Sequence, residues 1–170
     1  MTSLYGSTLV SKTHGRIAFR GLVDLLQAEV IEAQVLASTL GDTEICGALG
    51  EILAFLRTLM AAEVKETPLP PPFLFGMDAG EIHRQSHEVF IRNAEGKPAL
   101  PDYTHGPLVA RLNTLRAKTR EVELLSVKVF GPQDTNEAEP EREDIILALN
   151  RLSSALWWLT CQWQNKISIT

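Results

Sequence analysis

The fold is decided by the stretch at 16–39, which reads RIAFRGLVDLLQAEVIEAQVLAST. Its larger apolar residues recur three or four positions apart, at Ile17, Leu22, Leu25, Leu26, Val30, Val35 and Leu36. This spacing places them on one face of an α-helix of about 24 residues. That face must be buried against other elements, so the rest of the chain has to supply the packing partners.

The same period continues along the chain. A stop at Leu40-Gly41, with Asp42 or Thr43 as the next N-cap, starts a second helix. This second helix ends near Thr67, and a shorter helix capped by Asp78 covers about 79–91. A long helix of about 24 residues begins near Pro107. The last helix contains Ile145 to Leu159. No segment has the period of two that is typical of a strand.

The connecting segments differ in character. Pro68–Gly76 contains too many prolines for a helix and too many bulky apolar residues for a solvated linker, so we expect an extended strap on the bundle. Asn93–Pro98 has the composition of an exposed turn, and Gly131–Arg142 that of a polar, acidic loop. We therefore predict an all-α fold, an up-down bundle of four long helices plus one short helix. The predicted division is an N-terminal segment at 1–15 and a single helical-bundle domain at 16–166.

Composition narrows the function classes. The 170 residues carry a net charge of −5, with 16 Lys and Arg against 21 Asp and Glu, and the positive charges are scattered rather than striped. Nucleic acid is therefore a disfavoured partner. The N-terminus lacks a signal-peptide core and no uncharged apolar run approaches membrane length, so we predict a cytoplasmic protein without a membrane partner. Cys46 and Cys161 form no CxxC pair and are interpreted as small core residues.

Two groups of charged residues do not fit a helix bundle that keeps all of its charges on the solvent face. Asp24 lies beside the apolar stripe, and is either an exposed residue at its edge or a buried carboxylate that needs a cation. Arg116 and Arg120 lie four apart, on one helical face, and Glu123 can orient Arg120. Two guanidinium groups on one face suit a shared anion such as a triphosphate, although a solvated face is the more common explanation for this spacing.

The remaining polar residues allow two explanations each. Asn150 begins a polar turn, Asn-Arg-Leu-Ser-Ser, in an apolar helix, and is suited either to a bond with an adjacent helix or to a ligand. His83 and His87 lie at i and i+4, which suits two metal ligands if His105 or Asp102 supplies a third, or else they are ordinary surface histidines. The chain contains no P-loop, no GxGxxG after a strand and no GxSxG, so any ATP site must be built differently.

These motifs, taken in order, resemble the corrinoid adenosyltransferases. The carrying motifs are Ser11-Lys12, the run Gly15 to Asp24, Arg116-x-x-x-Arg120-x-x-Glu123 and Asn150-Arg-Leu-Ser153. The ethanolamine-utilisation branch is closer still, because its pattern also matches His83 to His87, His105-Gly106, Leu112 to Glu123 and Leu149 to Ser154. The likeness covers about residues 11–160.

The resemblance implies a transferase that moves the 5′-deoxyadenosyl group of ATP to Co(I) of cobalamin and releases the triphosphate. It implies a five-helix bundle, a homotrimer with its active sites between subunits, and ATP, Mg²⁺ and cob(I)alamin as cofactors or substrates. It also implies an electron-donating reductase as a partner. A cobalamin-dependent ethanolamine-degrading enzyme and a microcompartment are further associations that the ethanolamine-type likeness raises.

The resemblance also assigns roles to residues. Asp24 and Arg120 would form a catalytic charge pair, and no metal site made of protein side chains is implied. The ATP-binding set would be Lys12, Arg16, Arg116, Glu123, Asn150 and Arg151. The corrinoid side would be formed by Phe73, Phe75, Phe90, His83, His87 and His105, with plain core packing as the alternative for the three phenylalanines.

The sequence departs from the family pattern in three places. The Gly- and Thr-rich phosphate loop is reduced to Tyr5–Ser11, Leu124 stands where another Arg is common, and the Cys-rich segment of longer ethanolamine-type proteins has no counterpart here. We therefore expect ATP binding without zinc or iron. A non-catalytic corrinoid-binding or delivery protein on the same bundle stays open as an alternative, as does a helical scaffold that binds only a protein partner.

Overall fold

The five predicted helices are present. The structure, a computed structural model, describes residues 2–5, 8–11, 14–92, 97–132 and 141–167. Within these ranges the helices are α1 (Gly15–Thr39), α2 (Thr43–Lys65), α3 (Ala79–Glu88), α4 (Gly106–Phe130) and α5 (Glu143–Ile167). The prediction of an all-α bundle with four long helices and one short helix is confirmed.

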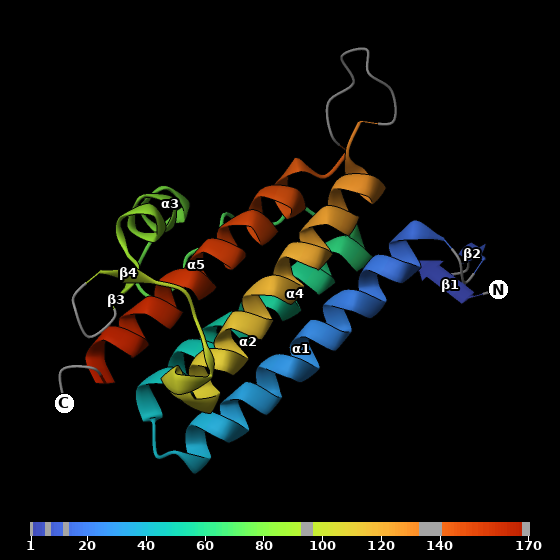
Figure 1. The fold of residues 1–170 in the computed structure, drawn as a ribbon. Coiled ribbons are helices and arrows are strands. Elements are labelled where there is room, and N and C mark those ends of the chain that lie inside the picture. Colours follow the sequence, from blue (N-terminus) through green and yellow to red (C-terminus); the bar gives the residue numbers. More distant parts are fainter. Residues whose placement is uncertain (1, 6–7, 12–13, 93–96, 133–140, 168–170) are drawn as a thin grey trace.

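The four long helices lie side by side, and α3 lies against α5 on the side away from α1 (Figure 1). Each long helix packs against two others, in the pairs α1–α2, α1–α4, α4–α5 and α2–α5. The start of α1 packs closely against the end of α4. A Cβ atom added to Gly15 would lie only 3.1 Å from Val129 Cγ2. Neighbouring long helices are therefore antiparallel, as an up-down bundle requires.

Side-chain caps set where the helices begin. Asp42 Oδ1 accepts a hydrogen bond from Ile45 N at 2.8 Å, and Asp78 Oδ1 accepts one from Glu81 N at 2.8 Å. These bonds satisfy backbone donors that the first turn leaves unpaired. Asp42 rather than Thr43 is thus the cap of α2, and the prediction for Asp78 is confirmed.

The prediction that the chain contains no strands is wrong. Two short antiparallel ribbons flank the helices, β1 (Thr2–Tyr5) with β2 (Thr8–Val10) and β3 (Ile91–Arg92) with β4 (Pro98–Ala99). β3 also shortens α3, which was expected to reach residue 91. Segments of two to four residues are too short to display a period, which is why the sequence did not reveal them. The predicted turn at 93–98 and loop at 131–142 lie largely outside the described residues.

The strap at 68–76 packs on the bundle as predicted. Leu69 and Leu74 are buried in the main core, and Asp144 Oδ2 accepts a hydrogen bond from Leu69 N at 2.8 Å. Gly76 has φ of +76°, in the left-handed region that glycine adopts without strain, and it lies in the turn that returns the chain toward α3. The strap therefore fixes the short helix relative to α5.

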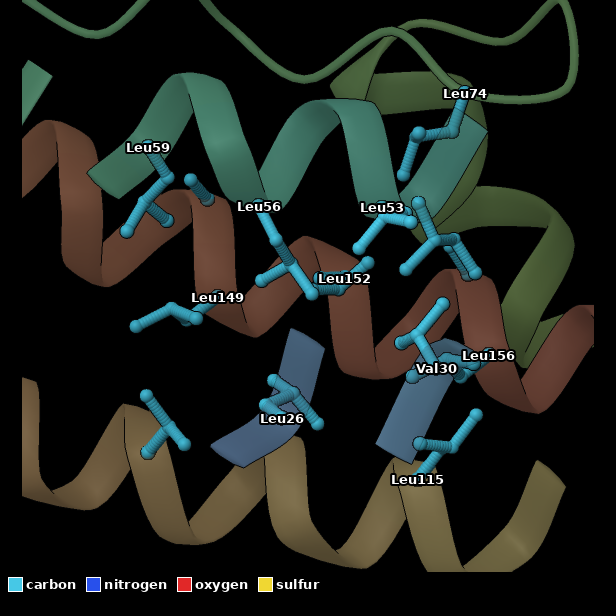
Figure 2. Close-up of a cluster of buried hydrophobic side chains, with 14 of the residues drawn as sticks. Leu26, Val30, Leu53, Leu56, Leu59, Leu74, Leu115, Leu149, Leu152 and Leu156 are labelled. Carbon is cyan, nitrogen blue, oxygen red and sulfur yellow. The ribbon is translucent and has the colours of Figure 1, made fainter. Parts of the chain in front are cut away.

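The core is a continuous set of leucines and other aliphatic side chains between the long helices (Figure 2). Leu26, Leu56, Leu115 and Leu152 come from α1, α2, α4 and α5 respectively, and each is fully buried. Cys161 is buried as predicted, whereas Cys46 is only half-buried. The core thus holds the four helices in fixed register and positions the polar residues outside it.

Helix α2 is also long and apolar enough to cross a membrane by length and composition, with a mean hydropathy of 1.6 over its most apolar window. Its inward side, which includes Leu49, Ile52 and Leu59, is buried in the bundle core. Core helices of this kind meet the same criterion.

Candidate active site

A cleft of about 390 Å³ opens between α4, α5 and α3. Its walls come from four segments and are formed by Ser86, His87, Leu100, Pro101, Arg116, Arg120, Ser153, Ser154 and Trp157. The predicted arginine pair, the predicted Ser-Ser turn and one predicted histidine therefore converge on one surface. Two arginines and one histidine therefore face the same cleft.

Arg116 is the central cation of the cleft. Its guanidinium lies over the Trp157 ring, 5.5 Å from the centroid, and its Nε donates to Asn113 Oδ1 at 3.2 Å. Burial lowers the pKa of Arg116, and the positive charge of Arg120 lowers it further. No carboxylate pairs with Arg116 or Arg120 among the described residues. A partly desolvated cation over an indole ring, with no carboxylate partner among the described residues, is suited to bind an anion.

The expected contact between Glu123 and Arg120 is wrong. Glu123 Oε1 instead accepts a hydrogen bond from Asn150 Nδ2 at 2.8 Å, and Asn150 Oδ1 accepts one from Arg151 Nη1 at 2.6 Å. Of the two explanations left open for Asn150, the bond to an adjacent helix is present, since Asn150 bonds to α4. This chain of bonds joins α4 to α5 one turn beyond the cleft and positions Arg151.

The histidines of α3 lie on the cleft side of α5. The rings of His83 and His87 are 4.5 Å apart and nearly perpendicular, and both residues are exposed. The positive charge of Arg151 lowers the pKa of His83, with smaller contributions from burial and His87. The described residues contain no group of three or more metal-ligating side chains.

His105 has a structural contact instead. Its Nδ1 accepts a hydrogen bond from Asp102 N at 3.0 Å, in a capping box that precedes α4. Asp102, in turn, accepts bonds from Thr104. Both candidates for a third metal ligand are therefore engaged at the start of α4 rather than with His83 and His87.

Arg16 lies at the other end of the bundle. It borders a separate cavity of about 540 Å³ with His14 and Lys128, and it forms ion pairs with Glu63 and Glu66. The start of α1 meets α4 nine residues beyond Arg120, a rise of about 14 Å along the helix. Within one chain, Arg16 and the cleft arginines are therefore apart. Lys12 lies outside the described residues.

Of the two explanations left open for Asp24, a single chain shows the exposed residue at the edge of the apolar stripe. Arg120 is exposed as well, and the described residues include no ion pair between them. Asp24 lies on the outer side of α1, where the apolar stripe ends. The expected charge pair stays a prediction for a contact between two subunits.

The three phenylalanines have different surroundings. Phe73 is 66% exposed, whereas Phe75 stacks on Trp158 with ring centroids 5.7 Å apart. The carbonyl of Phe90 accepts a hydrogen bond from Asn165 Nδ2 at 3.0 Å. None of the three is among the residues that line the cleft.

Sequence reasoning missed Trp157 and Glu63, and both had a usable signal. Trp157 lies seven residues after Asn150, on the same face of α5, so it could have been grouped with the polar turn. Glu63 follows Leu56 and Leu59 at helical spacing, on the inward face of α2. A carboxylate on an inward face requires a cation, which Arg16 and Arg20 provide.

The fold and cleft define an all-α bundle protein with two arginines and an aromatic ring in a cleft between its helices. The model of the family described as cobalamin adenosyltransferase matches residues 1–163, and the chain belongs to that family. It is 32% identical over 157 residues to the corrinoid adenosyltransferase EutT of Salmonella typhimurium strain LT2, and 31% identical to the protein of the same name from Escherichia coli strain K12. These alignments cover 92% of this chain and 56% of each relative, so the chain spans about half the length of the curated relatives it matches.

Proposed function

We propose that this protein transfers the 5′-deoxyadenosyl group of ATP to the cobalt of a Co(I) corrinoid. The observation that carries the proposal is the cleft in which Arg116 and Arg120 have no carboxylate partner among the described residues, in a chain of this family. In the reaction the Co(I) electron pair attacks C5′ of ATP, a Co–C bond forms, and the C5′–O bond breaks. The triphosphate leaves with the bonding pair, and the cobalt becomes formally Co(III).

The residue types fit this chemistry because Co(I) is itself a strong nucleophile. The protein needs no catalytic base, and its task is to position ATP and to stabilise the negative charge that develops on the leaving triphosphate. We assign that charge stabilisation to Arg116 and Arg120, and the alignment of α4 with α5 to Glu123, Asn150 and Arg151. Because no cluster of metal-ligating side chains occurs in the described part of the chain, Mg²⁺ is proposed to bind mainly to triphosphate oxygens.

We further propose that the active site forms between copies of this chain in a homotrimer. The outer sides of α1 and α4 carry exposed large apolar side chains, with Leu25 48%, Val35 62% and Leu124 72% exposed. Exposed apolar surface of this kind is typical of a protein interface. Asp24 on α1 and Arg120 on α4 carry opposite charges. Arg16 cannot reach the cleft of its own chain, but a second copy would bring its α1, with Arg16, to that cleft.

The decisive experiment mixes the purified chain with chemically reduced cobalamin, ATP and Mg²⁺ without oxygen, and follows the corrinoid absorption spectrum. We expect ATP-dependent formation of adenosylcobalamin with release of triphosphate. Arg120→Ala should lower turnover by about a hundredfold in an intact trimer, and Asp24→Asn by less. Arg57→Ala, which removes an exposed arginine on α2, is the matched control and should leave turnover unchanged.

One result would reject the proposed activity, and two others would reject parts of the proposed site. Corrinoid binding without any ATP-dependent spectral change would favour a delivery protein. An intact Arg120→Ala trimer with wild-type turnover would remove Arg120 from the site, and a sedimentation mass of one subunit would reject the shared site.

A further inference from the structure

The ion cluster at the start of α1 surrounds Arg16, and the roles of its carboxylates are not part of the function proposed so far. Arg16 and Arg20, one turn apart on α1, both contact Glu63 near the end of α2. The Glu63 side chain is fully buried, and the side chains of Arg16 and Arg20 are only 12% and 15% exposed. A buried carboxylate shared by two guanidinium groups fixes both of them in orientation.

Arg16 is held at both edges, by two different carboxylates. Its Nε donates to Glu63 Oε1 at 2.6 Å and its Nη2 to the Glu63 carbonyl at 3.0 Å, on the buried side. Its Nη1 donates to Glu66 Oε1 at 2.7 Å, on the exposed side. Glu66 is 56% exposed and is the C-cap of α2, with φ of +55° in the left-handed region.

The cluster is formally neutral, since it contains two guanidinium groups and two carboxylates. Arg16 also borders the cavity with His14 and Lys128, at the N-terminus of α1. That cavity is large enough for phosphate groups and also has Glu141 on its wall. The Glu66 carboxylate occupies the exposed edge of Arg16, so a phosphate oxygen that reaches this edge has to compete with it.

We propose that Glu66 is a counter-ion that an incoming phosphate of ATP replaces at Arg16, while Glu63 is the positioning residue that keeps the guanidinium in place. The inference rests on the proposed function, because it takes ATP as the ligand. When phosphate replaces Glu66 at Nη1, the two hydrogen bonds that Arg16 donates to Glu63 stay intact. Arg16 therefore loses no buried contact when the phosphate binds. Glu66 thus sets ATP affinity by competition, and Glu63 sets it by orientation.

The test measures ATP binding to the full chain by calorimetry, with Mg²⁺ and without corrinoid. Glu66→Gln removes the competing charge and should tighten binding by about threefold to tenfold, while Glu63→Gln should weaken it about tenfold. In the adenosylation assay, turnover at saturating ATP should change by less than twofold for Glu66→Gln. That split between affinity and turnover is not expected from a loss of stability alone.

Two control variants match these changes. Glu51→Gln removes the same charge from the same helix, about 22 Å from Glu66 along its axis. Asp144→Asn breaks the nearby ion pair with Arg142, at the same end of the bundle, without a contact to Arg16. Both should keep wild-type ATP affinity, and Asp144→Asn should lower the melting temperature.

The outcomes separate this inference from the proposed function. Wild-type affinity in Glu66→Gln, or in an Arg16→Ala variant, would overturn the inference while the proposed transferase stands. Glu66 is a surface position, so its variant decides the question even if Glu63→Gln does not fold. A wild-type chain that binds no ATP at millimolar concentration would overturn both.

Discussion

Removing the Arg116 side chain is the most direct perturbation of the cleft. At 4 Å from a phosphate charge, and with an effective dielectric constant of 20, its guanidinium would contribute a gross interaction of about 4 kcal/mol. Arg116 is already desolvated over Trp157, so binding an anion adds little further desolvation cost. A charge-assisted hydrogen bond retains about 1.5–3 kcal/mol after exchange with water.

We therefore expect Arg116→Ala to lose about 2–3 kcal/mol of transition-state stabilisation, which is about 30-fold to 150-fold in kcat/KM. Arg116→Lys keeps the charge but loses the planar fork and much of the stacking on Trp157, so about tenfold should be lost. Because a desolvated contact of this kind contributes about 2 kcal/mol, less than the usual stability of a folded domain, both variants should fold.

The assay is corrinoid adenosylation with ATP varied at saturating Co(I) corrinoid, combined with thermal melting of the same preparations. Arg57→Ala on α2 is again the control for the loss of one exposed arginine. A folded Arg116→Ala variant with kcat/KM within twofold of wild type would refute the reasoning. In the described part of the cleft, no other group both carries a positive charge and contacts Trp157, so none could replace Arg116.

The other predictions concern stability and reactivity. Leu56→Ala should lower the free energy of unfolding by about 2–5 kcal/mol in urea titrations, because the side chain is fully buried among all four long helices. Burial alone would raise the pKa of Asp144, but hydrogen bonds from Arg142 and Leu69 N hold it below its ordinary value. Asp144 therefore stabilises the fold above its unfolded-state pKa, and the difference in unfolding free energy between wild type and Asp144→Asn should shrink as the pH falls below about 4. Burial raises the pKa of Cys161 to about 12, so a thiol reagent at pH 8 should modify Cys46 in the native protein and Cys161 only after unfolding.

Much of the fold followed from the sequence because helical periodicity and caps are local. Asp42 and Asp78 lie next to the turns they cap, and their side chains reach backbone donors only three residues away. Pro107 in the first turn of α4 is equally local. The short strands β3 and β4 were not foreseen because their pairing depends on a partner across a turn rather than on their own residues.

The polar residues divide in the same way. The sequence placed Arg116 and Arg120 on one helical face, since four residues make nearly one turn. Which carboxylate meets which cation was decided by packing between helices: Glu123 bonds to Asn150 on α5, and Glu63 on α2 accepts from Arg16 on α1. Side-chain partners 27 and 47 positions apart have no signature in a single sequence, because their distance depends on how whole helices pack.

The sequence by itself therefore determined the helices and the family motifs, which depend on residues within a few turns of one another. It assigned the inward face of α1 only in part, because Leu26 and Val30 are buried whereas Leu25 and Val35 are exposed. Only the tertiary structure decided that Asp24 is exposed, that Arg116 lies over Trp157, and that Arg16 borders a cavity separate from the cleft. The physical reason is that helix formation is governed by local hydrogen bonds and spacing. The position of a charge relative to another helix is instead fixed by the packing of a shared apolar core.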